Sequence, residues 1–252
     1  MDATEVNARL TQLEERNDVS IVFATEIGTR AWGLPAPDDG HEVCAVFVRP
    51  RPAYLSVWPR DEVFAFKEDT LCVRAWDLRR FLQQLSKSSV VPAEWLRSTT
   101  RYRGSDAVYE RLLAFASRHL DFRDLFDHYR HLGGEAMRGY SDGQGNRRKA
   151  FVRALRELLA ARWVTERREL PPVTLRGLVG GLAPEASAAV AQLVGDFAQA
   201  APEDWTPPEA VAPLLRDTVA VLEAADLPRR PMLDDPELDE FFRASVNNAS
   251  EA

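Results

Sequence analysis

Cysteine is scarce in this chain of 252 residues, which has only Cys44 and Cys72. Two cysteines cannot form a disulfide framework in a chain of this length. Their number is typical of a protein kept in a reducing compartment, so we expect a cytoplasmic location. Long apolar runs are also lacking, so we expect no membrane span. Residues 1–16 are charged and have no apolar centre, which is unlike a secretory signal.

Positive charge is in deficit, with 32 Lys and Arg against 39 Asp and Glu, a net charge of -7 and an isoelectric point near 5.3. This balance excludes proteins that coat nucleic acid through their overall field, although a local basic patch could still hold phosphates. Apolar residues make up 45% and charged residues 28%, which are ordinary values for a globular protein. The length allows one large domain or two small ones.

The first hundred or so residues alternate between helix and strand patterns. Val6, Leu10 and Leu13 recur at helical spacing, which predicts a helix over residues 4–16. Short β-branched or alternating runs predict four strands, with a Pro-rich connection at 50–61 between the second and the third. The predicted strands are residues 19–25, 42–48, 62–68 and 70–76.

From Trp76 onward the apolar residues recur at about 3.6-residue spacing, which predicts helices. The predicted helices are residues 75–87, 92–98, 105–120, 122–137 and 147–168, followed after a break at 169–172 by 173–181, 183–200, 207–225 and 235–246. The chain therefore has the pattern of an α+β protein: a small mixed β-sheet domain with flanking helices, residues 1–103, followed by an all-helical domain, residues 104–252.

The stretch GTRAWGLPAPDDGHEVCAVFVRP, residues 28–50, has the pattern of a ligand-binding turn. Gly28 and Thr29 follow a predicted strand and begin a short helical turn, an order that presents backbone N–H groups and a hydroxyl to an anion. Gly28 allows close backbone approach, and Arg30 is near enough to reach a phosphate. The alternative is a simple tight turn without a ligand.

Side chains on the predicted strand 42–48 alternate between the two faces of the sheet. Gly40, Glu42 and Cys44 are expected on one face, and His41 on the other. Carboxylates at both 40 and 42 would hold two divalent cations for phosphoryl transfer. Of the two positions, only 42 carries a carboxylate, so Glu42 is either a remnant metal ligand or a polar residue at a sheet edge.

The run GTRAWGLPAPDDGHEVCAVFV resembles the signature of predicted nucleotidyltransferases of the DNA-polymerase-β superfamily, related to the RNA-ligase-associated family, whose usual run is close to GSRAWGFASPDSDYDVRFIYV. AWDLRRFLQQLSKSSVVPAEWLRS, DHYRHLG and RRKAFVRALRELLAARWVTERRELPP are similar to further family segments in the same order. The resemblance covers residues 5–180. It implies a nucleotidyltransferase-like first domain, with a nucleoside triphosphate (NTP) as ligand and Mg²⁺ as cofactor.

In that family an Asp-x-Asp pair and a third Asp on a neighbouring strand bind the metals. The resemblance places these three positions on Gly40, Glu42 and Cys72, so one carboxylate of three is left. Mg²⁺ prefers hard oxygen ligands in near-octahedral geometry, for which a thiol is a poor substitute. Asp38 and Asp39 would replace the missing ligands only through a shifted register.

The resemblance also carries over Gly28, Thr29 and Arg30, and Lys149 and Arg156 of the helical part. Lys149, Arg153 and Arg156 are spaced i, i+4, i+7, so we expect one basic helix face that holds a triphosphate or an RNA backbone. The alternative is an ordinary solvated face on which acidic neighbours pair with these residues. Those neighbours are Glu157 and Glu166.

Cys44 and Cys72 are expected on neighbouring strands. They could form a redox pair or, with Glu42, a Zn²⁺ site. We favour two buried, inert cysteines that fill the space left by lost charges. His128 matches a family position, and we expect it to be a structural histidine packed between helices.

Three hypotheses follow. The first is a pseudoenzyme that keeps the nucleotidyltransferase fold and binds a nucleotide, RNA or a protein partner without efficient metal-dependent transfer. The second is an active nucleotidyltransferase that transfers NMP from NTP to an RNA, protein or small-molecule acceptor through a rearranged cluster of Asp38, Asp39 and Glu42. The third is a structural or protein-interaction module without nucleotide affinity.

Overall fold

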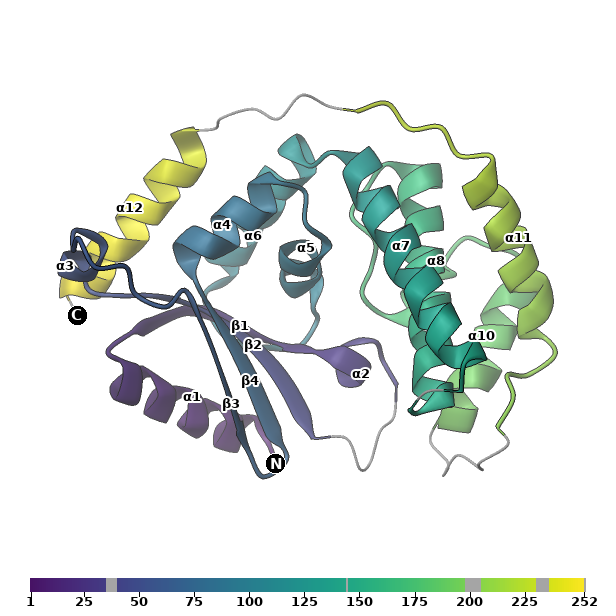
Figure 1. Ribbon diagram of the computed structural model, residues 1–252, viewed down its shortest axis with the longest axis horizontal. Coiled ribbons are helices and arrows are strands. Elements are labelled where there is room, and N and C mark those ends of the chain that lie inside the picture. The colour runs from purple at the N-terminus through teal and green to yellow at the C-terminus, as the bar shows by residue number, and fades with distance from the viewer. Residues whose placement is uncertain (35–39, 144, 198–204, 230–235, 252) are drawn as a thin grey trace.

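The computed structural model describes residues 1–34, 40–143, 145–197, 205–229 and 236–251. A five-stranded mixed sheet with helices on both faces forms one part of it, and a group of helices lies beside the sheet (Figure 1). This confirms the α+β prediction.

The sheet has the strand order β3-β4-β2-β1-β5. Every neighbouring pair is antiparallel except β2 and β4, which are parallel. Four strands match the predicted ones, whereas β5 was not predicted because three residues are too few to show a period. The strands are β1 (Ser20–Ile27), β2 (His41–Val48), β3 (Val63–Glu68), β4 (Leu71–Asp77) and β5 (Arg101–Arg103).

One face of the sheet is covered by α1 (Ala3–Asn17), which lies below the sheet in Figure 1. Its buried residues are Val6, Leu10 and Leu13, as the sequence predicted. The helix begins with a capping box, in which Asp2 accepts from the backbone N–H of Glu5 and the Glu5 side chain accepts from that of Asp2. Val43, Ala45 and Phe47 of β2 face this small core.

The other face of the sheet carries the larger core, to which β2 contributes Cys44, Val46 and Val48. The predicted alternation of β2 is therefore confirmed. Three helices pack above this face: α4 (Leu78–Ser86), α5 (Val90–Arg97) and α6 (Asp106–His119). The predicted Pro-rich connection includes a short helix, α3 (Arg51–Tyr54), which begins after Pro50.

Five further helices stand to the right of the sheet in Figure 1, and α7 and α8 form a hairpin at their centre. Eleven residues of α8 are buried, which makes it the central helix of this part. The helix predicted at 173–181 is only one turn long. The helices are α7 (Phe122–Ser141), α8 (Arg147–Arg167), α9 (Leu175–Leu178), α10 (Pro184–Phe197) and α11 (Val211–Glu223).

The last helix, α12 (Pro236–Glu251), returns to the sheet part and packs against α3, α4 and β2. The larger core also runs without interruption from the sheet into the helices. The predicted division at residues 103 and 104 stays a prediction. Within the described ranges, no helix is both long and apolar enough to cross a lipid bilayer.

Candidate functional site

The turn between β1 and α2 (Gly28–Ala31) brings three of the predicted residues together. Gly28 has φ +71°, and a Cβ atom at this position would lie 2.7 Å from Cδ of Glu42. Glycine is favoured here by its backbone conformation, whereas an added Cβ atom would displace only the end of the flexible Glu42 side chain, which is 44% exposed. Lys149 approaches from α8, with Nζ 3.7 Å from Oε1 of Glu42. We call this group, Gly28, Glu42 and Lys149, the glycine-turn cleft.

The other two residues of the predicted phosphate turn are placed differently from each other. Thr29 is 2% exposed, so its hydroxyl lies inside the protein and not on the open side of the turn. Arg30 is exposed, and its Nε donates to the carbonyl oxygen of Gly40 at 3.3 Å. Arg30 thus links the turn to the start of β2.

Gly40, the position of the family's first aspartate, has no room for a side chain. A Cβ atom there would lie 1.7 Å from the carbonyl oxygen of Thr70. The same carbonyl accepts a hydrogen bond from the backbone N–H of His41 at 2.7 Å, next to the first residue pair of β2 and β4. Close parallel pairing of the two strands has taken the space that an aspartate would need.

Cys72, the position of the third aspartate, pairs in register with Glu42. Cys72 is exposed and Cys44 is buried, so the expectation of two buried cysteines is wrong for Cys72, which lies near the start of β4. Burial raises the pKa of the Cys44 thiol. One carboxylate and one thiol do not fit Mg²⁺.

In the part of the chain that the structure describes, no group of three or more His, Cys, Asp or Glu residues could hold a metal ion. Cys44, Cys72 and Glu42 are among the described residues, so they do not form the Zn²⁺ site that the sequence analysis considered. Asp38 and Asp39 lie outside the described residues.

Arg156 does not share an open basic face with Lys149. It is 1% exposed, and its guanidinium binds Oε1 of Glu94 at 2.5 Å and Oε1 of Glu157 at 2.9 Å. It also donates to the carbonyl oxygen of Val173 at 3.0 Å. Lys149 and Arg156 do lie on one side of α8, but two turns beyond Lys149 that side is covered by neighbouring elements.

The cover over Arg156 includes part of the signature itself. The guanidinium carbon of Arg156 lies 5.1 Å from the centroid of the Trp32 ring, so the arginine joins α8 to the segment after the glycine turn. Arg153 is exposed, and Glu166 pairs with Arg162 and not with the predicted stripe. His128 is half-buried, and burial lowers its pKa.

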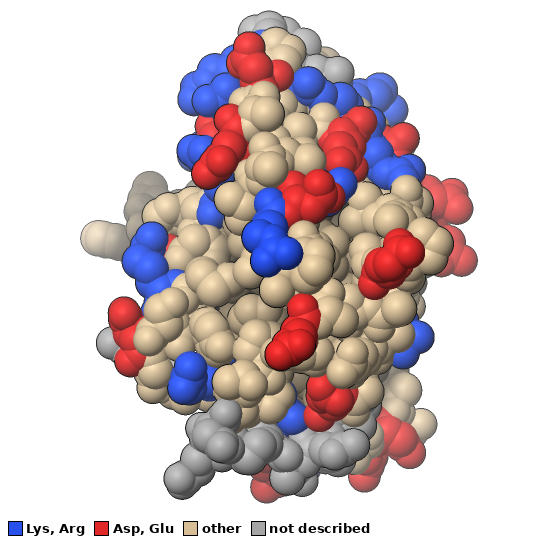
Figure 2. Space-filling model, turned by 90° about the vertical axis from the view of Figure 1, so that its right-hand side faces the viewer, with Lys and Arg blue, Asp and Glu red and all other residues tan. Residues whose placement is uncertain are grey.

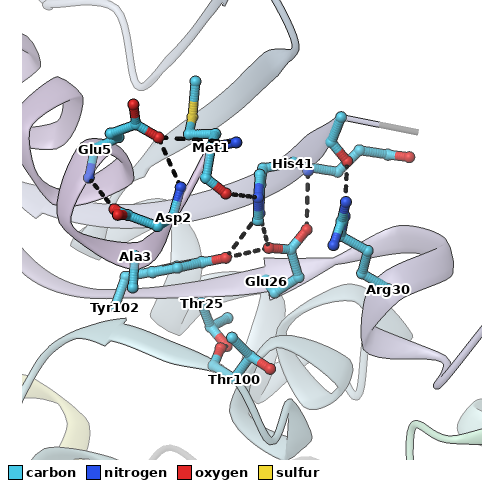
Figure 3. A network of polar contacts seen from close by, with 12 residues as sticks. Met1, Asp2, Ala3, Glu5, Thr25, Glu26, Arg30, His41, Thr100 and Tyr102 are labelled. Atoms are coloured by element: carbon cyan, nitrogen blue, oxygen red, sulfur yellow. Dashed lines mark hydrogen bonds and ion pairs between the residues drawn. The ribbon is translucent and has the colours of Figure 1, made fainter. Parts of the chain in front are cut away.

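A polar cluster at the end of β1 was missed by the sequence reasoning (Figure 3). The Glu26 side chain is 2% exposed. Its Oε2 lies 2.8 Å from Nδ1 of His41 and accepts a hydrogen bond from the Tyr102 hydroxyl. Its Oε1 accepts a hydrogen bond of 3.0 Å from the backbone N–H of Glu42. Burial raises the pKa of Tyr102, and the bond to Glu26 adds to the rise. The available signal was a carboxylate in an otherwise apolar strand.

This cluster fixes the start of β2 from the face opposite the glycine-turn cleft. His41 Nε2 lies 3.0 Å from the carbonyl oxygen of Met1, so the N-terminus is held to the same point. An open pocket of about 610 Å³ lies beside the cluster, and Arg30 and Arg176 are among its lining residues. Glu26 therefore acts as a support for the backbone that carries Glu42.

The sequence pattern of the RNA repair pathway DNA polymerase beta family matches residues 3–244. The chain belongs to this family. A relative from Bacillus subtilis (strain 168), named "Uncharacterized protein YcgL", is 29% identical over 177 residues, which are 70% of this chain and 68% of the relative. A solved structure of a nucleotidyltransferase-like protein from Exiguobacterium sibiricum 255-15 aligns with 98% of this chain and 77% of its own, at 13% identity and a TM-score of 0.32.

In this member of the RNA repair pathway DNA polymerase beta family, the strand–turn–strand arrangement brings the glycine turn against Glu42 of β2. The arrangement can attract an anion through Lys149 and the backbone of the turn. The negative charge of Glu42 repels an anion unless a positive charge offsets it. Lys149 supplies that positive charge here. The described residues of the cleft thus offer one basic and one acidic group.

Proposed function

We propose that this protein binds a nucleotide at the glycine-turn cleft and does not carry out efficient metal-dependent nucleotidyl transfer. The observation that carries the proposal is the overlap of any Gly40 side chain with the carbonyl oxygen of Thr70. A two-metal transfer site needs carboxylates that bridge the cations, and neither Gly40 nor Cys72 supplies one. Family membership and the convergence of Gly28 and Lys149 support retained nucleotide binding.

Lys149 is the cation closest to the Glu42 carboxylate in this cleft, so a bound triphosphate would compete with Glu42 for it. Binding therefore weakens the ion pair, although Lys149, with three N–H donors, can hold a phosphate oxygen and still offset the charge of Glu42. A pair 3.7 Å apart with both side chains about 40% exposed contributes at most about 1 kcal/mol, which a triphosphate can readily replace. Metal-independent binding of the triphosphate is the expected behaviour.

The test is calorimetric titration with ATP, CTP, GTP and UTP, each with and without Mg²⁺ or Mn²⁺. We expect binding of at least one nucleotide without metal, and a loss of affinity in Lys149→Ala. Lys87→Ala is the matched control, because Lys87 is an exposed lysine at the end of α4. No binding of any nucleotide would favour an interaction module instead.

A transfer assay with labelled NTPs and RNA, protein and small-molecule acceptors tests the other half of the proposal. We expect no metal-dependent incorporation. Robust transfer with Mg²⁺ that disappears in Asp39→Asn would overturn the proposal in favour of a rearranged cluster of Asp38, Asp39 and Glu42.

A further inference from the structure

The end of the molecule at α3 carries an exposed apolar segment. Leu55, Val57 and Trp58 are 73%, 85% and 77% exposed, although they lie within four residues of one another. Single exposed apolar residues are common on protein surfaces, but a cluster that includes a nearly free Trp is typical of a binding surface. Figure 1 shows α3 at the left of the molecule, on the side away from α10 and α11.

Two hollows adjoin this segment and share Tyr54 and Arg79 in their walls. One has a volume of about 190 Å³ and the other about 320 Å³. We call the segment and the two hollows the α3 surface. Its arginines are Arg49, Arg51, Arg60, Arg79 and Arg243.

The charge of the α3 surface is opposite to that of the whole chain. Five arginines line the two hollows, against two carboxylates, Glu62 and Asp77. Asp77 accepts from the Tyr54 hydroxyl and from the backbone N–H of Arg79, both at 2.8 Å, and Glu62 lies 3.7 Å from Arg80. Arg243 lies 3.6 Å from Asp239, and Arg49 is half-buried and donates to the carbonyl oxygens of Asn17 and Asp61. Arg51, Arg60 and Arg79 are exposed and supply the positive charge of this surface.

The face at the helical end is different. Lysines and arginines there are interspersed with aspartates and glutamates (Figure 2). Arg162 of α8, for example, pairs with Glu166 at 2.8 Å and with Asp217 of α11 at 2.6 Å. The net charge of -7 therefore does not describe the α3 surface.

We propose that the α3 surface binds a single-stranded nucleic acid, with a base stacked on Trp58 and the backbone phosphates held by the arginines around the two hollows. Exposed aromatic rings beside a basic groove are the arrangement that holds single strands without reading their sequence. Arg79 is held at the junction of the two hollows, where its guanidinium carbon lies 4.9 Å from the centroid of the Tyr54 ring and 5.3 Å from that of the Phe242 ring. This site is separate from the glycine-turn cleft and does not depend on the function proposed for it.

A second copy of the chain fits this surface less well. A two-fold contact would bring the same arginines of both copies together, where they repel one another. Three exposed side chains are also too little apolar area for a stable dimer, which needs about 800 Å² from each partner.

The test uses a fluorescein-labelled oligouridylate of about 12 nucleotides, within the usual length of a single-strand site, and fluorescence anisotropy. We expect wild-type binding that weakens steeply between about 50 and 200 mM salt. Trp58→Ala should lower the affinity about tenfold or more, and Trp58→Phe should restore most of it because it keeps a stacking ring. Trp58 is largely exposed, so these changes leave the core intact.

Arg60→Glu is compared with Arg216→Glu, an exposed arginine of α11 at the other end of the molecule. Arg60→Glu should weaken binding and reduce the salt slope, whereas Arg216→Glu should not change the slope. Nucleotide titrations of Trp58→Ala should match the wild type, which separates this inference from the proposed function.

Three results would overturn the inference. The first is no binding of the oligonucleotide by the wild type at low salt. The second is unchanged affinity in Trp58→Ala. The third is oligonucleotide binding that does not change in Trp58→Ala, combined with a different role for Trp58. That role would be a Trp58-dependent dimer in sedimentation or Trp58-dependent binding to vesicles of phosphatidylserine.

Discussion

Replacing Gly40 by alanine tests whether the pairing of β2 and β4 leaves no room for a side chain at this position. The added Cβ would lie 1.7 Å from the carbonyl oxygen of Thr70, whereas carbon and oxygen atoms in close contact stay about 3.3 Å apart. The chain at position 40 must therefore move by more than an ångström. The movement breaks the 2.7 Å hydrogen bond from the backbone N–H of His41 to the same oxygen.

The expected loss follows from these two effects. A backbone hydrogen bond contributes about 0.5–1.5 kcal/mol and the strain of overpacking costs about 1–3 kcal/mol, so Gly40→Ala should lower the free energy of unfolding by about 1.5–4.5 kcal/mol. Urea unfolding followed by circular dichroism measures this value. Gly139→Ala is the control, because Gly139 lies inside α7 with no atom within 4 Å of an added Cβ. It should stabilise the protein by about 0.5–1 kcal/mol.

Whether Gly40→Ala lowers or raises the free energy of unfolding shows whether position 40 has room for a side chain. If position 40 had room for a side chain, alanine would stabilise the folded state by about 0.4–1 kcal/mol, because it restricts the unfolded chain. A stabilised Gly40→Ala protein would refute the steric reasoning, and the first metal position would then be open to an aspartate.

Three further predictions concern other side chains. Arg156→Ala should lower the free energy of unfolding in urea by about 3–5 kcal/mol, because it leaves the buried Glu157 without its cation; Arg156→Lys should recover only part of this loss, and a change below about 1 kcal/mol would contradict the argument. In a thiol assay with Ellman's reagent, Cys72 should react quickly in the native protein, whereas Cys44 should react only after denaturation, because it is buried and its thiol pKa is raised; two fast thiols would refute this. Burial lowers the pKa of His128 from 6.5, so the unfolded state binds its proton more tightly and stability is lost as pH falls through 6.5. Wild type should therefore lose more stability than His128→Gln between about pH 7 and pH 5, and equal losses would show that His128 does not contribute.

The sequence predicted the regular parts of the fold because their periods reflect burial. Val6, Leu10 and Leu13 of α1 and the alternation of β2 lie where the pattern placed them. Gly28 and Lys149 were expected near the same ligand, and the structure brings both to Glu42.

The rest depended on contacts between distant segments. The spacing of Arg156 gave its side of the helix correctly, but spacing does not show that Glu94 and Trp32 cover that side. The overlap at Gly40 arises from Thr70, thirty positions away in the turn before β4, and no local pattern reports it. Glu26 is likewise explained only by His41 and Tyr102.

The return of α12 to the first part of the chain has a consequence for synthesis. The helix packs on α3, α4 and β2, and the last of these elements ends at Ser86. At ribosomal rates of about 5–20 residues per second, roughly 10–30 s separate the emergence of that surface from the completion of its cover. During this interval the ring of Tyr54 lacks the edge-to-face contact that it makes with Phe242 in the folded protein. The early sheet is thus a nascent domain whose apolar flank stays open to chaperones and proteases until the final helix has been made.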